Sequence, residues 1–391
     1  MIEGKVSEVE GKLIRYGMVG GGQGAFIGDV HRKAAGFDGK AQLISGVFSR
    51  SHENTMMTGK SLGIHPERLY RDFEEMARQE GAREDGIDFV SIVTPNHAHY
   101  PIAKAFLENG INVVCDKPFT FNVEEAEGLA CIAKTRDLLI CVTYEYSGYP
   151  MVKHAREMIR RRDIGDIRVI SAQYLQGWLA TPLEATGQKQ AAWRTDPKQA
   201  GSSNCVGDIG SHIENTVSYI TGLKIRSICA NLDIFGENRE LDDNAEILVR
   251  YDNGASGVYH SSQVAIGHDN DLRVQVFGTK GSIEWVQENP NYLRVAHLGQ
   301  PIKVLSRGES YIYPQAARLS RIPSGHPEGY FEAFANIYFV FIGTLLKKKA
   351  GQALCDEDLD FPGVEAGVTG VKFINKCVES SKKGSVWVSL D

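Results

Sequence analysis

The feature that most constrains the fold is a regular alternation of short apolar runs and helix-forming stretches over residues 13–144. The apolar runs are rich in Val and Ile, and most of them end at a group of Gly, Asp, Asn or Pro residues. Such runs are typical of strands buried on both faces of a parallel sheet, with the helices as crossovers. Residues 1–145 are therefore predicted to form a doubly wound α/β domain.

A glycine-rich turn follows the first apolar run, 13–19, and precedes the first helical stretch. Glycine permits the turn and lets the backbone approach a pyrophosphate, while the helix N-terminus directs its free N–H groups at the phosphates. A plain glycine-rich turn could have the same sequence, but the strand before it and the helix after it favour dinucleotide binding. The residues expected to bind the cofactor here are Gly20, Gly22, Gln23, Gly24, Ala25 and Phe26.

The end of the second predicted strand bears on the choice of cofactor. An Asp or Glu usually stands there to bind the ribose hydroxyls of NAD, whereas this chain has Ser49 and Arg50. Arginine can bind a ribose phosphate through two parallel hydrogen bonds, and it can also simply lie in solvent. The sequence therefore leaves both NAD and NADP open.

Two further strand ends carry polar groups, and ligands of such sheets bind beyond the carboxyl ends of the strands. Lys117 is followed by a proline, which holds it extended, and its amine could exchange protons if a cleft desolvated it. A surface lysine at a turn is the alternative. The His97-x-His99 pair lacks further ligands nearby, so we expect no metal. The residues expected to line the cofactor cleft are Thr94, Pro95, Asn96, His99, Asp116 and Lys117.

The pattern changes after residue 145, where strands separated by hairpin turns predict a large, mostly antiparallel sheet. Residues 146–391 are therefore predicted to form a second α/β domain. It contains a long polar loop, 177–203, of the kind that is usually functional or disordered. One helical face near the end is predicted to be core; its members are Phe331, Phe334, Tyr338, Phe341, Ile342 and Leu345.

Asp208 and His212 are four residues apart near the start of a predicted helix, 210–220, which would place them on one face. Histidine is the natural proton-transfer group near neutral pH. The alternative is an Asp that caps the helix and a buried His that is bonded to backbone. Both readings stay open on the residues alone.

Composition excludes several classes of function. The formal net charge is −6, and the basic runs 160–162 and 347–349 are only three residues long, so we expect neither nucleic acid nor a membrane surface as a partner. The 7 cysteines are scattered without a C-x-x-C pair, which fits a reducing compartment. The N-terminus lacks the apolar core of a signal peptide, and the longest apolar run is too short to span a bilayer. We therefore expect a cytoplasmic protein.

Taken together, the motifs GMVGGGQGA, TPNHAHY, DKP, GDIGSHIEN and GHPEGYFEAFANIY resemble the Gfo/Idh/MocA family of sugar oxidoreductases, over nearly the whole chain. The resemblance implies a Rossmann domain that binds NAD or NADP, followed by an α/β domain whose sheet commonly forms the subunit interface. We therefore expect a homo-oligomer, either a dimer or a tetramer. At two positions the chain departs from the usual residues of this family. Asp116 stands where Glu is commoner, and Ser49 stands after the second strand, where an acidic residue is usual.

The resemblance also implies roles for individual residues. Lys117, Asp208 and His212 would be catalytic, and Trp193 and Arg194 would lie near the nicotinamide. The residues expected to bind a sugar or polyol substrate are Lys117, Tyr149, Gln173, Gln176, Trp193, Asp208 and His212, although some of these could be ordinary strand and loop residues.

The expected reaction is the reversible oxidation of a ring secondary alcohol of a sugar, glycoside, anhydrosugar or inositol. His212 would accept the hydroxyl proton, Lys117 would stabilise the charge on the oxygen, and Asp208 would orient a hydroxyl or the histidine. Lys117 as the proton acceptor is the alternative. A non-catalytic, nucleotide-responsive regulatory protein on the same fold is the competing function, and the presence of all three residues together argues against it.

Overall fold

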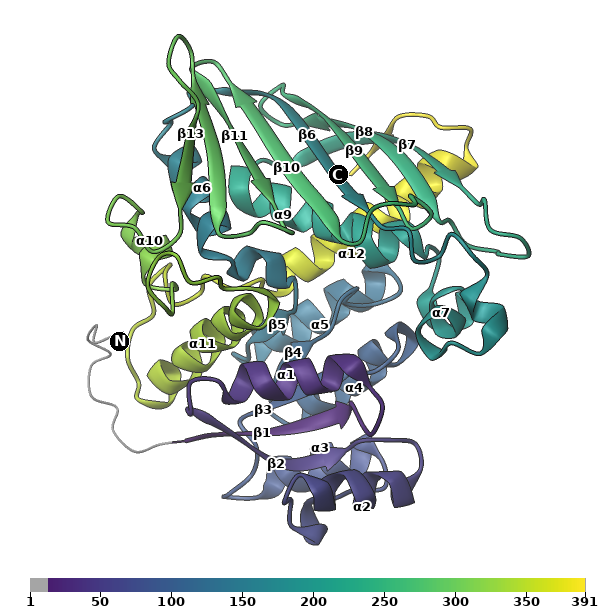
Figure 1. The fold of residues 1–391 in the computed structure, drawn as a ribbon. Helices are drawn as coiled ribbons and strands as arrows, with labels where there is room; N and C mark the ends of the chain where they lie inside the picture. The colour runs from purple at the N-terminus through teal and green to yellow at the C-terminus, as the bar shows by residue number, and fades with distance from the viewer. Residues whose placement is uncertain (1–12, 391) are drawn as a thin grey trace. The chain divides into compact units, whose positions relative to one another are not determined.

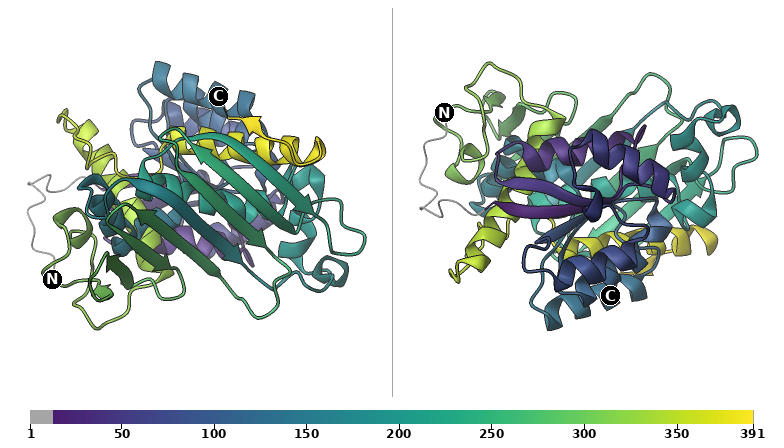
Figure 2. Two further views of the ribbon diagram at one scale, coloured as in Figure 1. Left: turned by 90° about the horizontal axis from the view of Figure 1, so that it is seen from above. Right: turned by 90° about the horizontal axis from the view of Figure 1, so that it is seen from below.

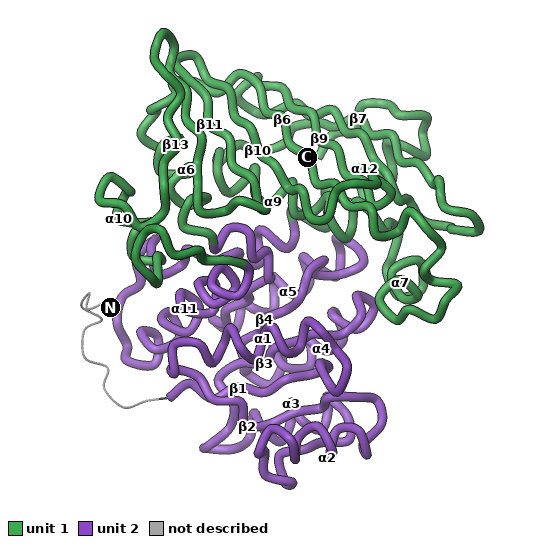
Figure 3. The backbone as a smooth tube through the Cα atoms, in the orientation of Figure 1, with its two compact units in different colours: residues 1–2, 149–329, 369–391 green, residues 3–148, 330–368 purple. Residues whose placement is uncertain are grey.

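The computed structural model describes residues 13–390, and their contacts form two compact units (Figure 3). Residues 13–148 and 330–368 make up the first, here named the parallel-sheet unit. Residues 149–329 and 369–390 make up the second, the large-sheet unit. These bounds differ from the sequence-based division at residue 145, because residues 330–368 pack with the first unit. The division into a dinucleotide-binding part, 1–145, and a substrate-binding part, 146–391, stays a prediction about function.

The parallel-sheet unit is built on five strands in the order β2-β1-β3-β4-β5, and every neighbouring pair is parallel (Figure 1). All residues of the central strand β3 are buried, which requires cover on both faces of the sheet. The predicted doubly wound sheet is therefore confirmed. Its strands are β1 (Ile14–Gly20), β2 (Ala41–Val47), β3 (Phe89–Val93), β4 (Asn112–Cys115) and β5 (Ile140–Val142).

The helices of this unit pack in two groups. Helix α1 (Phe26–Gly36) packs against α11 (Tyr330–Lys349), whereas α3, α4 and α5 pack side by side. The aromatic face predicted for the late helix lies mostly in the core, and Tyr338 and Phe341 are almost fully buried. Phe331 is an exception, since it is 37% exposed and lies beneath the ammonium of Lys33. The remaining helices are α2 (His52–Ser61), α3 (Phe73–Ala82), α4 (His99–Glu108) and α5 (Val123–Thr135).

The large-sheet unit contains a nine-stranded sheet in the order β13-β12-β11-β10-β6-β9-β8-β7-β14. Only the pair β6·β9 is parallel, so the predicted, mostly antiparallel sheet is confirmed. The strands are β6 (Ile167–Leu175), β7 (Ile225–Asp233), β8 (Asn244–Tyr251), β9 (Ser256–Ser262), β10 (Asp271–Gly278), β11 (Gly281–Val286), β12 (Tyr292–His297), β13 (Lys303–Ser306) and β14 (Val388–Ser389).

Helices cover one face of this sheet. They are α6 (Pro150–Arg160), α9 (Ser211–Thr221) and the part of α12 (Val364–Lys382) that belongs to this unit. Within residues 13–390, no helix lies on the opposite face, as the left view of Figure 2 shows. Strand β8 reflects this arrangement in its alternation of buried and exposed residues. The one-sided cover places α9, which follows Asp208, directly beneath the sheet.

The segment between β6 and α9 is more ordered than the predicted loop 177–203. It contains a 3-10 turn (Leu183–Thr186) and the short helices α7 (Lys189–Arg194) and α8 (Pro197–Ala200). The side chains of Gln188 and Asp196 cap these two helices at their N-termini. Local capping therefore gives this polar segment a defined structure.

Candidate functional site

The glycine turn between β1 and α1 brings backbone unusually close to backbone. A Cβ atom on Gly22 would lie 2.7 Å from the carbonyl oxygen of Phe48, to which Gly22 N–H donates at 3.1 Å. Gly20 has φ +87°, a left-handed conformation that favours glycine. Gln23 and Gly24 are exposed, and so is Phe26 at 65%. The turn therefore leaves backbone accessible in front of the first turn of α1, as an anion site at a helix N-terminus requires.

Gly21 and Gly28 are two glycines that the sequence analysis did not single out. A Cβ atom on Gly28 would lie 2.4 Å from the Cα atom of Gly21, so only glycine allows α1 to pack this closely on the turn. Ala25, the small residue that ends the glycine turn, stands at the N-cap of α1. Gly21 precedes α1, which begins at Phe26, so no helical spacing marks Gly28 in the sequence.

Ser49 and Arg50 follow β2 and lead into α2. The backbone N–H of Ser49 donates to the hydroxyl of Thr55, and Ser51 caps the helix by accepting from Asn54 N–H. Arg50 is exposed. Arg50 thus follows the carboxyl end of β2, two residues after Phe48, whose carbonyl oxygen accepts from the N–H of Gly22 in the glycine turn.

His99 ties two strand ends together. Its Nε2 atom lies 2.9 Å from the carbonyl oxygen of Thr94, after β3, and its Nδ1 atom lies 2.8 Å from that of Pro118, after β4. Its side chain is fully buried, and burial lowers its pKa, although Asp116 and the two carbonyls favour the charged ring. Both ring nitrogens thus contact backbone, and the predicted contact of His99 with a cofactor stays a prediction. Asn96 is buried, whereas Pro95 is partly exposed.

Asp116, at the end of β4, lies in a buried polar cluster. Its Oδ1 atom accepts a hydrogen bond from the Thr143 hydroxyl at 2.7 Å and lies 3.7 Å from Nε2 of His31. Burial would raise the pKa of Asp116, but the contacts with His31 and Thr143 and the nearby His99 hold it at about 2. The carboxylate therefore stays ionised beside Lys117.

Glu145, on the turn after β5, is a second acidic residue near Lys117, and the sequence analysis missed it. Its side chain is 4% exposed, and burial raises its pKa to about 8. The charge of Lys117 and a hydrogen bond with Tyr330 oppose that shift. An acidic residue directly after a buried strand was the available signal. Lys117, which precedes a cis peptide bond to Pro118, follows Asp116 in the chain and interacts electrostatically with Glu145.

In the large-sheet unit, Asp208 lies in a π-helical turn, Val206–Gly210, and α9 begins only at Ser211. The helix agrees with the predicted range 210–220, and the π-helical turn before it, which inserts a residue into the α-helical pattern, is an addition to that prediction. The N-cap of α9 is Gly210, so Asp208 does not cap that helix. The helix-cap alternative for Asp208 is therefore wrong. His212, in the first turn of α9, is 4% exposed and packs near the ring of Tyr174.

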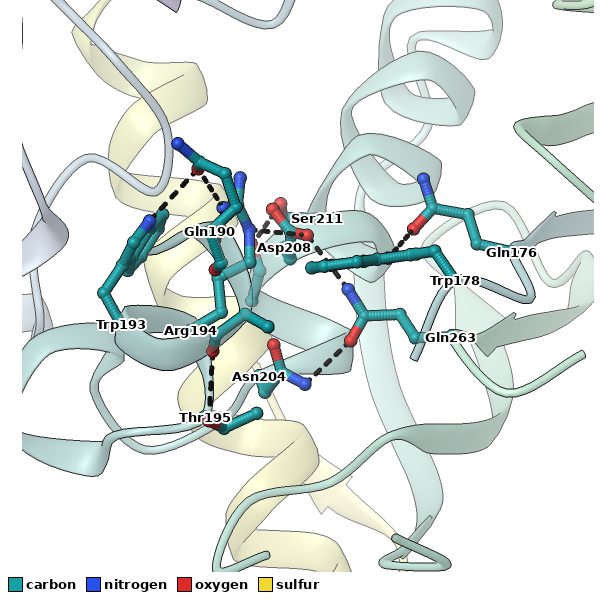
Figure 4. Close-up of polar contacts among 12 residues, drawn as sticks. Gln176, Trp178, Gln190, Trp193, Arg194, Thr195, Asn204, Asp208, Ser211 and Gln263 are labelled. Atoms are coloured by element: carbon teal, nitrogen blue, oxygen red, sulfur yellow. Dashed lines mark hydrogen bonds and ion pairs between the residues drawn. The ribbon is translucent and has the colours of Figure 1, made fainter. Parts of the chain in front are cut away.

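Figure 4 shows the contacts of the Asp208 carboxylate. Its Oδ2 atom accepts from Nε2 of Gln263 at 2.9 Å and from Nε of Arg194 at 3.1 Å. The guanidinium of Arg194 lies over the ring of Trp193 at 4.3 Å and donates to Gln190 of its own helix. The contact between Arg194 and Asp208 therefore joins α7 to the turn that carries Asp208.

An indole and two amides lie beside this carboxylate. Trp178, which the sequence analysis did not list, points toward Asp208 in Figure 4 and donates from its indole N–H to Gln176 at 2.9 Å. Gln173 donates to Asp271 at 2.7 Å. Tyr149 is different: its ring is buried and packs on Trp285 at 5.3 Å. The structure thus brings Gln176, Trp193, Arg194 and Asp208 together, and it adds Trp178 and Gln263.

The predicted site residues divide between the two units. Those expected to bind the cofactor, apart from Trp193 and Arg194, all lie at the carboxyl ends of β1, β2, β3 and β4 in the parallel-sheet unit, as does Lys117. Asp208 and His212 belong to the large-sheet unit. The meeting of Lys117 with Asp208 and His212 stays a prediction.

Two family models match the chain. The model described as "Oxidoreductase family, NAD-binding Rossmann fold" matches residues 14–144, and the model described as "GFO/IDH/MocA C-terminal domain" matches residues 152–284. The chain belongs to the Gfo/Idh/MocA family. The resemblance predicted from its motifs is thereby confirmed, and so is its membership among the NAD-binding oxidoreductases.

Relatives within the Gfo/Idh/MocA family match along almost the whole chain. The uncharacterized oxidoreductase YfiI of Bacillus subtilis (strain 168) is 37% identical over 385 residues, which are 97% of each protein. The crystal structure of an inositol dehydrogenase homolog from Azotobacter vinelandii, complexed with NAD+, has a TM-score of 0.92 and 38% identity over 97% of each chain. A structure complexed with NADH and myo-inositol, from the same organism, has a TM-score of 0.90 and 38% identity, covering 97% of this chain and 98% of the other.

The family implies a bound dinucleotide, and the residues of the parallel-sheet unit fit one. The turn at Gly22 and Gly28 leaves no room for a Cβ atom, and it stands before a helix N-terminus at the carboxyl edge of a parallel sheet. Within residues 13–390, each helix is too short or too polar to cross a membrane.

Proposed function

We propose that this member of the Gfo/Idh/MocA family oxidises a secondary alcohol on the ring of a sugar or cyclic polyol, with NAD or NADP as the electron acceptor. The observation that carries the proposal is the grouping of an ionisable carboxylate (Asp208), an indole (Trp178) and an amide (Gln176) on one side of the large-sheet unit. Carboxylates and amides bind hydroxyl groups, and an indole offers an apolar surface to a sugar ring.

The acid–base chemistry is assigned to three side chains. His212 accepts the proton of the reacting hydroxyl, since an imidazole titrates near neutral pH. Lys117 donates a hydrogen bond to the same oxygen and stabilises its developing negative charge. Asp208 orients a neighbouring hydroxyl or the imidazole. Lys117 as the proton acceptor is the competing assignment.

The cofactor is assigned to the carboxyl edge of the parallel sheet. When bound, the nicotinamide supplies the site that accepts the hydride. The glycine turn and the first turn of α1 hold its pyrophosphate. Ser49 and Arg50 would bind its adenosine ribose, Thr94, Pro95 and Asn96 would contact the rest of the dinucleotide, and Trp193 and Arg194 would contact the nicotinamide. The residues assigned to the pyrophosphate are Gly20, Gly22, Gln23, Gly24, Ala25 and Phe26.

The experiment is a panel of inositols, pyranoses, glycosides and anhydrosugars, each mixed with NAD or NADP and followed at the absorbance of the reduced nicotinamide. We expect turnover of at least one ring alcohol. His212→Ala and Lys117→Ala should each lower kcat at least about 100-fold, the usual share of acid–base catalysis. Gln275→Ala, in the same large sheet, is the matched control and should keep parental activity.

Two results would count against this function. Nicotinamide binding without turnover of any compound would favour the nucleotide-responsive regulatory protein. Near-parental turnover by His212→Ala or Lys117→Ala would remove that residue from the mechanism. Distinguishing His212 from Lys117 as the proton acceptor requires the pH dependence of kcat in each variant, because removing the acceptor abolishes the acidic limb of the profile.

We also propose that the chain forms a homo-oligomer through the open face of the large sheet. Val169 on β6 lies directly opposite Phe277 on β10, and Leu248 on β8 lies opposite Val258 on β9. Each of these four side chains is 39–49% exposed, on central strands without helical cover. An apolar band of this kind marks an interface between proteins. Val258→Lys should shift the sedimentation coefficient toward that of a monomer, and an unchanged coefficient would contradict the proposal.

A further inference from the structure

We propose that Gln263 is a positioning residue for Asp208, whose carboxylate it holds through its side-chain amide. This inference rests on the proposed function in so far as Asp208 serves catalysis. Gln263 follows directly after β9, lies outside every motif discussed above, and is fully buried. Its hydrogen bond to Asp208 fixes the orientation of that carboxylate.

The backbone of Gln263 is held from both directions. Its N–H donates to the carbonyl of Asp243 at 2.8 Å, and its carbonyl accepts from the N–H of Leu179 at 3.0 Å. Leu179 directly follows Trp178, the indole beside Asp208. Gln263 therefore joins the end of β9, the start of β8 and the segment after β6, and its side chain starts from a fixed point.

Both polar atoms of the Gln263 side-chain amide make hydrogen bonds. Its Nε2 donates to Oδ2 of Asp208 at 2.9 Å, and its Oε1 accepts from Nδ2 of Asn204 at 2.7 Å. An ionised carboxylate only accepts hydrogen bonds, so the amide must direct its NH2 group at Asp208. Turning the amide over would place its oxygen against Oδ2 of Asp208 and its NH2 group against the NH2 group of Asn204. The orientation of Gln263 and the charge on Asp208 therefore support one another.

Asn204 is fixed in turn by Asp242, a carboxylate that is 4% exposed. Asp242 accepts from the N–H of Asn204 at 3.0 Å, from the N–H of Val206 at 3.0 Å and from the hydroxyl of Ser203 at 2.9 Å. These three donors belong to the residues that lead into the π-helical turn. A buried series of contacts thus runs from Asp242 through Asn204 and Gln263 to Asp208, within the large-sheet unit.

Gln263 and Arg194 contact the same oxygen of Asp208 but differ in burial. Gln263 is fully buried, whereas the side chain of Arg194 is 22% exposed and belongs to α7, in the segment between β6 and α9. Gln263 therefore provides the fixed contact, while Arg194 adds the charge. The thiol of Cys205 is a further titratable group that interacts with Asp208 in this unit.

The test uses Gln263→Glu, which keeps the size and shape of the side chain and replaces the donor with a second carboxylate. Two carboxylates at this distance share a proton, so we expect the acidic limb of the kcat profile to move to higher pH by about one unit or more. At pH 7, kcat should fall about tenfold or more, and it should recover as the pH rises. Gln275→Glu is the matched control, because Gln275 also donates to a carboxylate, that of Glu284, and should leave the pH profile unchanged.

An exchange of the two groups gives a readout that does not need turnover. Asp208→Asn combined with Gln263→Glu restores one amide and one carboxylate in contact, so the pair should regain most of the melting temperature lost by Gln263→Glu alone. The proposal would be overturned if the melting-temperature loss of the double variant equalled the sum of the losses of Asp208→Asn and Gln263→Glu. A Gln263→Glu profile whose acidic limb coincides with that of the parent would also overturn it.

Two further variants keep the test decisive. If Gln263→Glu does not fold, Gln263→Met removes both hydrogen bonds at similar length, and kcat should fall while the melting curve stays cooperative; parental kcat would overturn the proposal. If the parent shows no turnover with any ring alcohol, the proposed function fails. The melting temperatures of the exchanged pair then still decide whether Gln263 holds Asp208.

Discussion

The Nε2 atom of His31, on α1, lies 3.7 Å from Oδ1 of Asp116, at the end of β4. His31 is fully buried, and its Nδ1 atom lies 2.7 Å from the hydroxyl of Tyr338 on α11. The imidazole thus bridges a late helix and the strand end that carries Lys117. This relationship explains why residues 330–368 belong to the parallel-sheet unit.

Replacing the carboxylate of this pair should destabilise the protein. Asp116→Ala leaves the buried Thr143 hydroxyl without its acceptor and removes the carboxylate 3.7 Å from Nε2 of His31, which costs about 1–3 kcal/mol of unfolding free energy. Urea denaturation of the cofactor-free protein measures the loss. The control is Asp29→Ala, since Asp29 is half-exposed and its ion pair with Lys33 contributes less than about 1 kcal/mol. An equal loss of unfolding free energy in Asp116→Ala and Asp29→Ala would contradict a stabilising role of the buried Asp116 contacts.

Adding one methyl group to the glycine turn should impair cofactor binding. The Cβ atom in Gly22→Ala would lie 2.7 Å from the Phe48 carbonyl oxygen, so the backbone must move. We expect the Kd for NAD or NADP, measured by titration calorimetry, to rise at least about tenfold, or 1.4 kcal/mol. Gly36→Ala is the matched control, because the space around Gly36 is open and alanine favours the helix. Parental affinity in Gly22→Ala would remove this turn from the binding site.

Arg50 should matter for NADP and not for NAD. Its exposed guanidinium at the carboxyl edge of the sheet can pair with a ribose phosphate. Arg50→Ala should therefore weaken NADP binding about tenfold and change NAD binding less than about twofold. Arg78→Ala, another exposed arginine of this unit, controls for a general loss of positive charge. A ratio of the two affinities that stays at the parental value would contradict this role of Arg50.

Glu214 makes the stability of the large-sheet unit depend on pH. Burial raises its pKa from 4.5 to about 7, although Ser218 donates a hydrogen bond to it at 2.7 Å. A raised folded-state pKa stabilises the protonated form, so this contribution is complete below pH 4.5 and is lost as the pH rises through 7. Glu214→Gln cannot ionise, so it does not lose this stability as the pH rises. At pH 8.5 its free energy of unfolding should exceed that of the parent by about 3 kcal/mol.

The measurement is the free energy of unfolding as a function of pH for Glu214→Gln and for the parent. The curves should converge near pH 4.5 and separate above it. Glu237→Gln, at an exposed position of the same unit, should follow the parent at every pH. Parallel curves for Glu214→Gln and the parent would show that the carboxyl group does not titrate in this range.

The parallel sheet and the glycine turn could be predicted because they are local. Strands buried on both faces are apolar throughout, and a turn with positive φ requires glycine within a few residues. The same reasoning did not identify the π-helical turn that carries Asp208, because a π-helical turn and an α-helix differ by one residue and have similar compositions. It also missed Gln263, which lies 55 residues from Asp208 in the chain and has no motif around it.

The sequence by itself determined the two sheets, the family and the residue types that could move a proton. The tertiary structure decided which side chains meet: His31 with Asp116, Gln263 with Asp208, and Arg194 with the same carboxylate. The physical reason is that a strand or helix forms from neighbours along the chain. A buried hydrogen bond between distant residues instead depends on how whole strands and helices pack, and the packing of the complete core fixes that arrangement.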